Sequence, residues 1–133
     1  MRFSQIDGLD VVTRIAGPIH HFLGIEFGRR SAGAPRMEMV DGEGNLRSES
    51  NEGSPPPESV RWEVVRGIEQ ANQRLGSALA ARVVRYCVDD PAVAGVYEML
   101  AEALAERVVQ NSASRDEKTV PIREPDSVGE PST

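Results

Sequence analysis

The sequence has 133 residues and a formal net charge of −6, from 21 acidic and 15 basic residues. Because no basic cluster exceeds the pair Arg29 and Arg30, the chain lacks the positive surface that binds phosphates, and a nucleic-acid partner is not expected. No apolar run approaches the roughly 20 residues that cross a bilayer, and the single cysteine cannot form an intrachain disulfide. We therefore expect a soluble cytoplasmic protein that does not bind membranes, and the predominance of Arg over Lys favours a bacterial origin.

Three β-strands are predicted in the first 40 residues, at 9–15, 19–27 and 36–40. The turn residues 16–18 (AGP) separate the first two, which are expected to pair as an antiparallel hairpin. The second strand alternates in polarity, which places His21 with Leu23 and Ile25 on one face and His20 on the other.

Two amphipathic helices are predicted, at 57–76 and from Pro91 to about residue 110, because apolar residues recur every three or four positions in both segments. Gly76 is expected to end the first helix, and Asp90 is expected to cap the second. Between the helices, residues 81–88 are apolar on both faces of the predicted strand, which indicates an interior position in a sheet.

The resulting order, β-β-β-α-β-α, predicts an α+β fold in which both helices pack on one face of a small mixed or antiparallel sheet. We expect a single domain over residues 1–110. Residues 41–57 have few large apolar side chains and end in three prolines, so they are predicted to form a flexible loop. Residues 111–133 are polar and rich in proline, and are predicted to be a disordered tail.

Adjacent histidines, His20 and His21, are the first candidates for catalysis. Neighbouring residues of a strand point to opposite faces, so the pair cannot bind one metal ion, and no HExxH motif or Cys/His spacing of a zinc site is present. We predict no metal site and no cofactor. Packing explains one histidine and solvent exposure the other, and the open question is which of them faces a cavity.

Cys87 is a candidate nucleophile, because a cysteine beside a histidine base can attack a substrate. A lone cysteine within a strand is more commonly a small buried apolar residue. Three further residues are candidates for ligand binding: Arg29 and Arg30 through paired guanidinium groups, and Asp89 through its carboxylate at the end of a strand. A solvated turn explains each of these three as well.

The sequence favours a small non-catalytic protein–protein interaction module, such as an adaptor, an immunity-type inhibitor or an accessory subunit. The acidic charge and the absence of a catalytic motif support this interpretation. Its expected contact surface includes Trp62, Arg66 and Tyr97, because aromatic and arginine side chains dominate protein interfaces. Two alternatives stay open: a small enzyme or ligand-binding protein that uses His20 or His21 in a pocket, and a homo-oligomeric structural subunit. A homodimer is compatible with the first interpretation.

Overall fold

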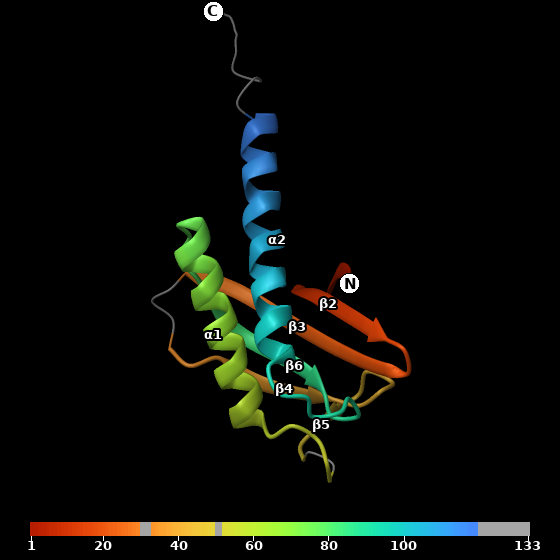
Figure 1. Cartoon of the computed structure of the whole chain (residues 1–133). Coiled ribbons are helices and arrows are strands. Elements are labelled where there is room, and N and C mark those ends of the chain that lie inside the picture. The colour runs from red at the N-terminus through yellow and green to blue at the C-terminus, as the bar shows by residue number, and fades with distance from the viewer. Residues whose placement is uncertain (30–32, 50–51, 120–133) are drawn as a thin grey trace, which may run out of the picture.

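The computed structural model describes residues 1–29, 33–49 and 52–119. Two helices, α1 (Pro57–Leu75) and α2 (Val96–Thr119), lie on one face of a six-stranded sheet (Figure 1). The strands, in spatial order, are β1 (Arg2–Ile6), β2 (Leu9–Ala16), β3 (Ile19–Arg29), β6 (Leu79–Cys87), β4 (Arg36–Val40) and β5 (Leu46–Arg47). The predicted α+β class is confirmed, with a mixed sheet.

Strand pairing follows the polarity pattern of the sequence. The predicted hairpin is present as the antiparallel pair β2–β3. β6 lies inside the sheet, antiparallel to β3 on one side and parallel to β4 on the other. Its two faces are both covered: Val84 and Tyr86 lie in the core beneath the helices, and Val83 lies in a smaller apolar cluster on the other face. This explains the apolar residues at nearly every position. The parallel pair is joined through α1, which crosses over the sheet between β4 and β6.

Two strands were not predicted from the sequence. β1 is mostly exposed, and of its side chains Phe3 packs against the core, so it has no alternating apolar pattern. β5 lies within the segment 41–57 that was predicted to be a flexible loop. A turn closes this short hairpin: the Asp41 carboxylate accepts the backbone N–H groups of Glu43 and Asn45, each at 2.9 Å. The pairing therefore depends on local polar contacts rather than on apolar side chains.

The second helix begins later than predicted and ends later. It starts at Val96 rather than Pro91, because the Asp90 carboxylate binds β3 instead of capping the helix. Glu63 of α1 takes the capping role and accepts the backbone N–H groups of Tyr97 at 3.0 Å and Glu98 at 3.3 Å. The helix continues to Thr119, so the part of the predicted tail before residue 120 is helical, and residues 120–133 lie outside the described residues.

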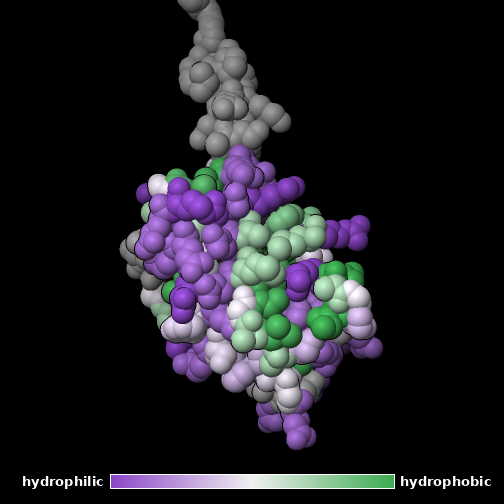
Figure 2. All heavy atoms as spheres, viewed as in Figure 1, coloured by the Kyte–Doolittle hydropathy of each residue, from purple (hydrophilic) through white to green (hydrophobic). Residues whose placement is uncertain are grey.

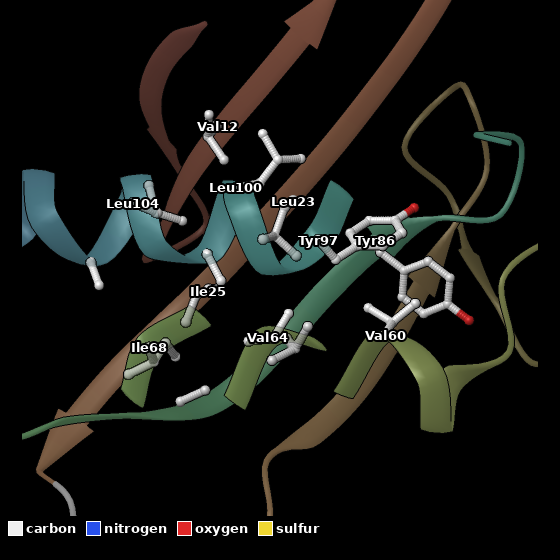
Figure 3. Close-up of a cluster of buried hydrophobic side chains, with 14 of the residues drawn as sticks. Val12, Leu23, Ile25, Val60, Val64, Ile68, Tyr86, Tyr97, Leu100 and Leu104 are labelled. Atoms are coloured by element: carbon white, nitrogen blue, oxygen red, sulfur yellow. The ribbon is translucent and has the colours of Figure 1, made fainter. Parts of the chain in front are cut away.

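The core lies between the helices and the sheet (Figure 3). Apolar side chains of α1 and α2 meet those of the central strands, and the fully buried members include Leu23, Ile25, Val64, Tyr86, Leu100 and Leu104. The two helices approach closely at Gly67, where a Cβ atom would lie 2.3 Å from the carbonyl oxygen of Glu98. Glycine at this position therefore sets the distance between the helices.

The opposite face of the sheet carries a second, smaller apolar cluster formed by Leu9, Val11 and Val83, with Phe22 packed against it. Gly24 allows this packing, because a Cβ atom there would already lie 3.3 Å from Cδ1 of Leu9. The turn between β1 and β2 also reaches this face, where Asp7 lies 3.1 Å from the guanidinium of Arg85. The face away from the helices is thus partly covered by this turn.

Candidate functional site

A pocket of about 440 Å³ lies on the face of the sheet away from the helices. We call it the open-face pocket. It is bounded by the turn after β1, the beginning of β3, the ends of β4 and β6, and the loops that follow them. Its apolar lining comes from Ile6, Phe22, Val40 and Cys87. Phe22 and Cys87 flank the core-facing pair Leu23–Tyr86, and strand alternation turns them toward the pocket.

Asp90 joins the loop after β6 to the start of β3 at this pocket. One of its carboxylate oxygens accepts the Phe22 backbone N–H at 2.7 Å, and the other lies 3.3 Å from Nδ1 of His20. The Asp90 side chain is buried, whereas the His20 side chain is 49% exposed. The contact therefore orients the histidine ring at the rim of the pocket.

Asp89 lies on the same side and accepts the backbone N–H of Gly42 at 2.7 Å. This bond connects the loop after β6 to the turn after β4. Asp41, in that turn, also lines the pocket, and the N–H groups of Asn45 and Glu43 that it accepts hold the pKa of its carboxyl below the usual range. Asp41 is therefore ionised at neutral pH.

Arg85 lies at the side of the pocket and takes part in an ion-pair network on the sheet surface. Its guanidinium lies 2.9 Å from the Glu38 carboxylate and 3.1 Å from that of Asp7, while Arg36 donates to Glu38 at 2.8 Å. Burial raises the pKa of the Glu38 carboxyl, but the hydrogen bonds from Arg85 and Arg36 outweigh it and the net pKa is lowered. Two carboxylates therefore share the charge of Arg85.

Cys87 is buried, with 6% of its surface exposed. Burial raises the pKa of its thiol, and the negative charges of Asp90 and Asp89 raise it further, although backbone N–H groups of these residues oppose the shift. The neutral thiol is the favoured form at neutral pH. The environment of Cys87 is therefore the opposite of the electropositive setting that activates a nucleophilic cysteine.

His21 points into the core, as strand alternation predicted. It is 1% exposed, its Nε2 lies 2.9 Å from the Pro91 carbonyl oxygen, and its ring packs edge-on against Tyr97 with centroids 5.8 Å apart. Neither Nδ1 of His21 nor the Tyr97 hydroxyl has a hydrogen-bond partner within the described part of the chain. His21 has a structural role, and His20 is the histidine that faces a cavity.

The structure thus brings three of the predicted candidates to one pocket: His20, Cys87 and Asp89. It does not bring Arg29 there, which is exposed at the far end of β3, and Arg30 lies outside the described residues. The sequence did not indicate the contributions of Asp7, Asp41 or Arg85, because they come from segments far apart in the chain. The spacing of residues along the sequence does not show that such distant segments line one pocket.

A larger groove of about 820 Å³ runs along α1 on the other side of the molecule. We call it the α1 groove; its apolar lining includes Pro35, Trp62, Val65, Ile68, Leu79 and Ala80. Trp62 is 59% exposed and Val65 is 41% exposed. The guanidinium of Arg66 stacks on the Trp62 ring, 4.6 Å from its centroid. Arg66 also lies 3.7 Å from Glu98 of α2, which holds its head group above the helix surface.

Tyr97, predicted as a third member of the contact surface, is 2% exposed and lies in the core. It occupies the first turn of α2, where its ring packs between His21 and Tyr86. Desolvation raises the pKa of its phenol well above the usual value. The prediction for Tyr97 is therefore wrong, because this residue lies on the same face of α2 as the core residues Leu100 and Leu104.

Hydrophilic residues cover most of the surface over α1 on the left of Figure 2, whereas hydrophobic residues gather to the right of α2.

Within residues 1–29, 33–49 and 52–119, the side chains form no group of three or more residues suited to hold a metal ion. The helices in these same ranges include none that is long and apolar enough to cross a membrane. Comparison with protein families, curated proteins and solved structures finds no match for the chain.

Proposed function

We propose that this protein is a non-catalytic protein–protein interaction module and that the α1 groove is its contact surface. The observation that carries the proposal is the exposure of Trp62, the single tryptophan of the chain, beside an apolar groove of about 820 Å³. An exposed tryptophan at an apolar groove resembles the aromatic anchors that dominate binding energy at protein interfaces.

The lining of the groove supports one kind of partner. Apolar side chains form much of it. Among the described residues that line it, Glu58, Glu63 and Glu69 are acidic and Arg61, which pairs with Glu58 at 2.6 Å, is basic. An apolar groove with acidic residues in its lining complements an apolar segment flanked by Lys or Arg. We therefore assign as occupant a segment of another protein that presents one or two large apolar side chains next to basic residues.

The open-face pocket supports binding better than catalysis. It contains a cysteine, a histidine and an aspartate, the residue types of a nucleophilic site. However, burial and the neighbouring carboxylates raise the pKa of the Cys87 thiol, so they oppose formation of the thiolate. This environment is a second observation in favour of a non-catalytic function.

Site-specific photocrosslinking in the native host tests the proposal. A photoreactive residue replaces Val65 in the groove or, as a matched control, Gln73, which is exposed on the same helix outside the groove. We expect a partner protein to crosslink through position 65 and not through position 73. The crosslink should disappear when Trp62→Ala is added. In the partner, the crosslinked site should lie in an apolar segment flanked by Lys or Arg.

Three outcomes would overturn the proposal. Crosslinking at position 65 that does not exceed crosslinking at position 73 would remove the groove as a contact surface. A partner captured equally well by the Trp62→Ala variant would remove the tryptophan as an anchor. Crosslinking mainly to a second copy of this chain would favour the homo-oligomeric alternative.

A further inference from the structure

We propose that the open-face pocket binds a small organic cation, an ammonium or guanidinium group carried on an aliphatic chain. This site shares no lining residue with the α1 groove, so the inference goes beyond the proposed function and is independent of it. It depends on the shape of the pocket, on the residues of its apolar surface and on the charges around that surface.

The first argument is size and shape. A volume of about 440 Å³ lies in the range, roughly 300 to 1,000 Å³, of pockets that hold small ligands. Ile6 and Val40 offer aliphatic contact from two sides, and Phe22 contributes an aromatic ring. An aliphatic chain of a few carbons would contact the aliphatic residues, and a cationic head placed over the ring would gain a cation–π interaction.

The second argument is charge. Among the described residues that line the pocket, four carry carboxylates, Asp7, Asp41, Asp89 and Asp90, and one, Arg85, carries a guanidinium. The net charge of these groups is therefore −3 when His20 is neutral. A concave surface lined by one sign of charge concentrates the electric field and attracts the opposite charge.

The third argument is that Arg85 is already paired with carboxylates of the protein. Its guanidinium is shared between Glu38, at 2.9 Å, and Asp7, at 3.1 Å. It is therefore not available as the binding group for an anionic ligand. An anion in the pocket would face three further carboxylates.

The fourth argument is the arrangement of the carboxylates. Asp90 and Asp41 are both fixed by backbone N–H groups, of Phe22 in one case and of Glu43 and Asn45 in the other. A carboxylate oxygen can accept more than one hydrogen bond, so these groups can also accept donors from a ligand. Fixed carboxylates beside an aromatic ring bind a cation without the cost of ordering their own side chains.

The test is a titration followed by two-dimensional NMR of the full chain, with n-butylguanidinium and n-butylammonium as probes. Butyrate is the anionic control and 1-butanol the neutral control. We expect the NMR chemical shifts of the backbone amides of Phe22, Gly42 and Cys87 to change saturably with both cations. The two control compounds should not change them. In the single variant Asp89→Asn, we expect the affinity to fall at least threefold.

The variant Glu43→Gln is the matched control, because it removes an exposed acid next to the pocket that does not line it. Its affinity should match that of the unmodified chain. The proposal would be overturned if folded protein showed no saturable shift with either cation, or if butyrate shifted the same amides equally. Equal weakening by Glu43→Gln would also overturn it, since net charge rather than the pocket would then explain binding.

Discussion

Asp90 accepts the backbone N–H of Phe22 at 2.7 Å, and through this bond the loop before α2 is fastened to the beginning of β3. The acceptor is 5% exposed, so the bond is shielded from water. A buried N–H that loses its acceptor incurs a desolvation penalty of about 1 to 3 kcal/mol. Asp90 is thus a structural residue of the sheet as well as a wall of the open-face pocket.

The first prediction concerns this bond. Asp90→Ala should lower the free energy of unfolding by about 1 to 3 kcal/mol, because the Phe22 N–H loses its acceptor. Chemical denaturation with urea measures the change. Glu43→Ala, at an exposed position, should stay within about 0.5 kcal/mol of the unmodified chain. Equal stability of the two variants would show that the bond does not contribute.

The second prediction concerns the contact between the helices. In Gly67→Ala the new methyl group would meet the Glu98 carbonyl oxygen at 2.3 Å, so the helices must separate. We expect a loss of about 1 to 3 kcal/mol in unfolding free energy, measured by thermal or urea denaturation. Gly33→Ala is the control, because a Cβ atom there meets nothing within 4 Å. If Gly67→Ala left the unfolding free energy unchanged, the close approach of α1 and α2 at this position would be contradicted.

The third prediction concerns the start of α2. Glu63 accepts three backbone N–H groups there, from Gly95, Tyr97 and Glu98. Glu63→Ala should destabilise the protein by about 0.5 to 2 kcal/mol, the usual cost of losing a helix cap. In Glu63→Ala, the backbone amides of Tyr97 and Glu98 should exchange faster with solvent than in the unmodified chain, and this increase should be larger than elsewhere in α2. Uniform exchange along the helix would argue against Glu63 as the cap.

The fourth prediction concerns pH. The folded-state pKa of Glu38 is lowered, since hydrogen bonds from Arg85 and Arg36 outweigh burial. A lowered folded-state pKa stabilises the protein above the unfolded-state value, and this stability is lost as the pH falls through the folded-state pKa. The unfolding free energy should therefore depend less on pH in Glu38→Gln than in the unmodified chain between about pH 5 and pH 3. The prediction would be contradicted if the unfolding free energies of Glu38→Gln and of the unmodified chain changed equally with pH.

The fifth prediction concerns Cys87. Because the thiol is buried and its pKa is raised, iodoacetamide should alkylate the folded protein at pH 8 at least tenfold more slowly than the urea-unfolded protein. Intact-mass spectrometry over time measures both rates. Rapid alkylation of the folded protein would revive the interpretation of Cys87 as a nucleophile.

Much of the fold follows from local sequence patterns. The alternation in 19–27 correctly separates His21 from His20, and the apolar residues of 81–88 correctly indicate an interior strand. The helical periodicity identifies α1, whose end at Gly76 has the left-handed backbone that glycine favours. These features depend on neighbours within one element, and a single sequence contains that information.

The errors have a common physical cause. The predicted start of α2 was wrong because Asp90 and Pro91 are residue types that commonly begin a helix. The residue that caps α2 in the structure, Glu63, belongs to another helix. The open-face pocket was missed as a unit because the turn after β1 reaches across the sheet to Arg85. Both features depend on contacts between distant segments, which a polarity pattern along the chain does not report.

The most direct test of the proposed function uses the single tryptophan. The chain is labelled with 5-fluorotryptophan, and the one fluorine resonance of Trp62 is followed by NMR as the crosslinked segment of the partner, prepared as a peptide, is added. The account predicts a saturable shift and a dissociation constant that rises at least thirtyfold in Trp62→Ala, measured by calorimetry, which corresponds to about 2 kcal/mol or more at an anchor residue. Binding that leaves the fluorine resonance unchanged, or that is equally tight in Trp62→Ala, would contradict it.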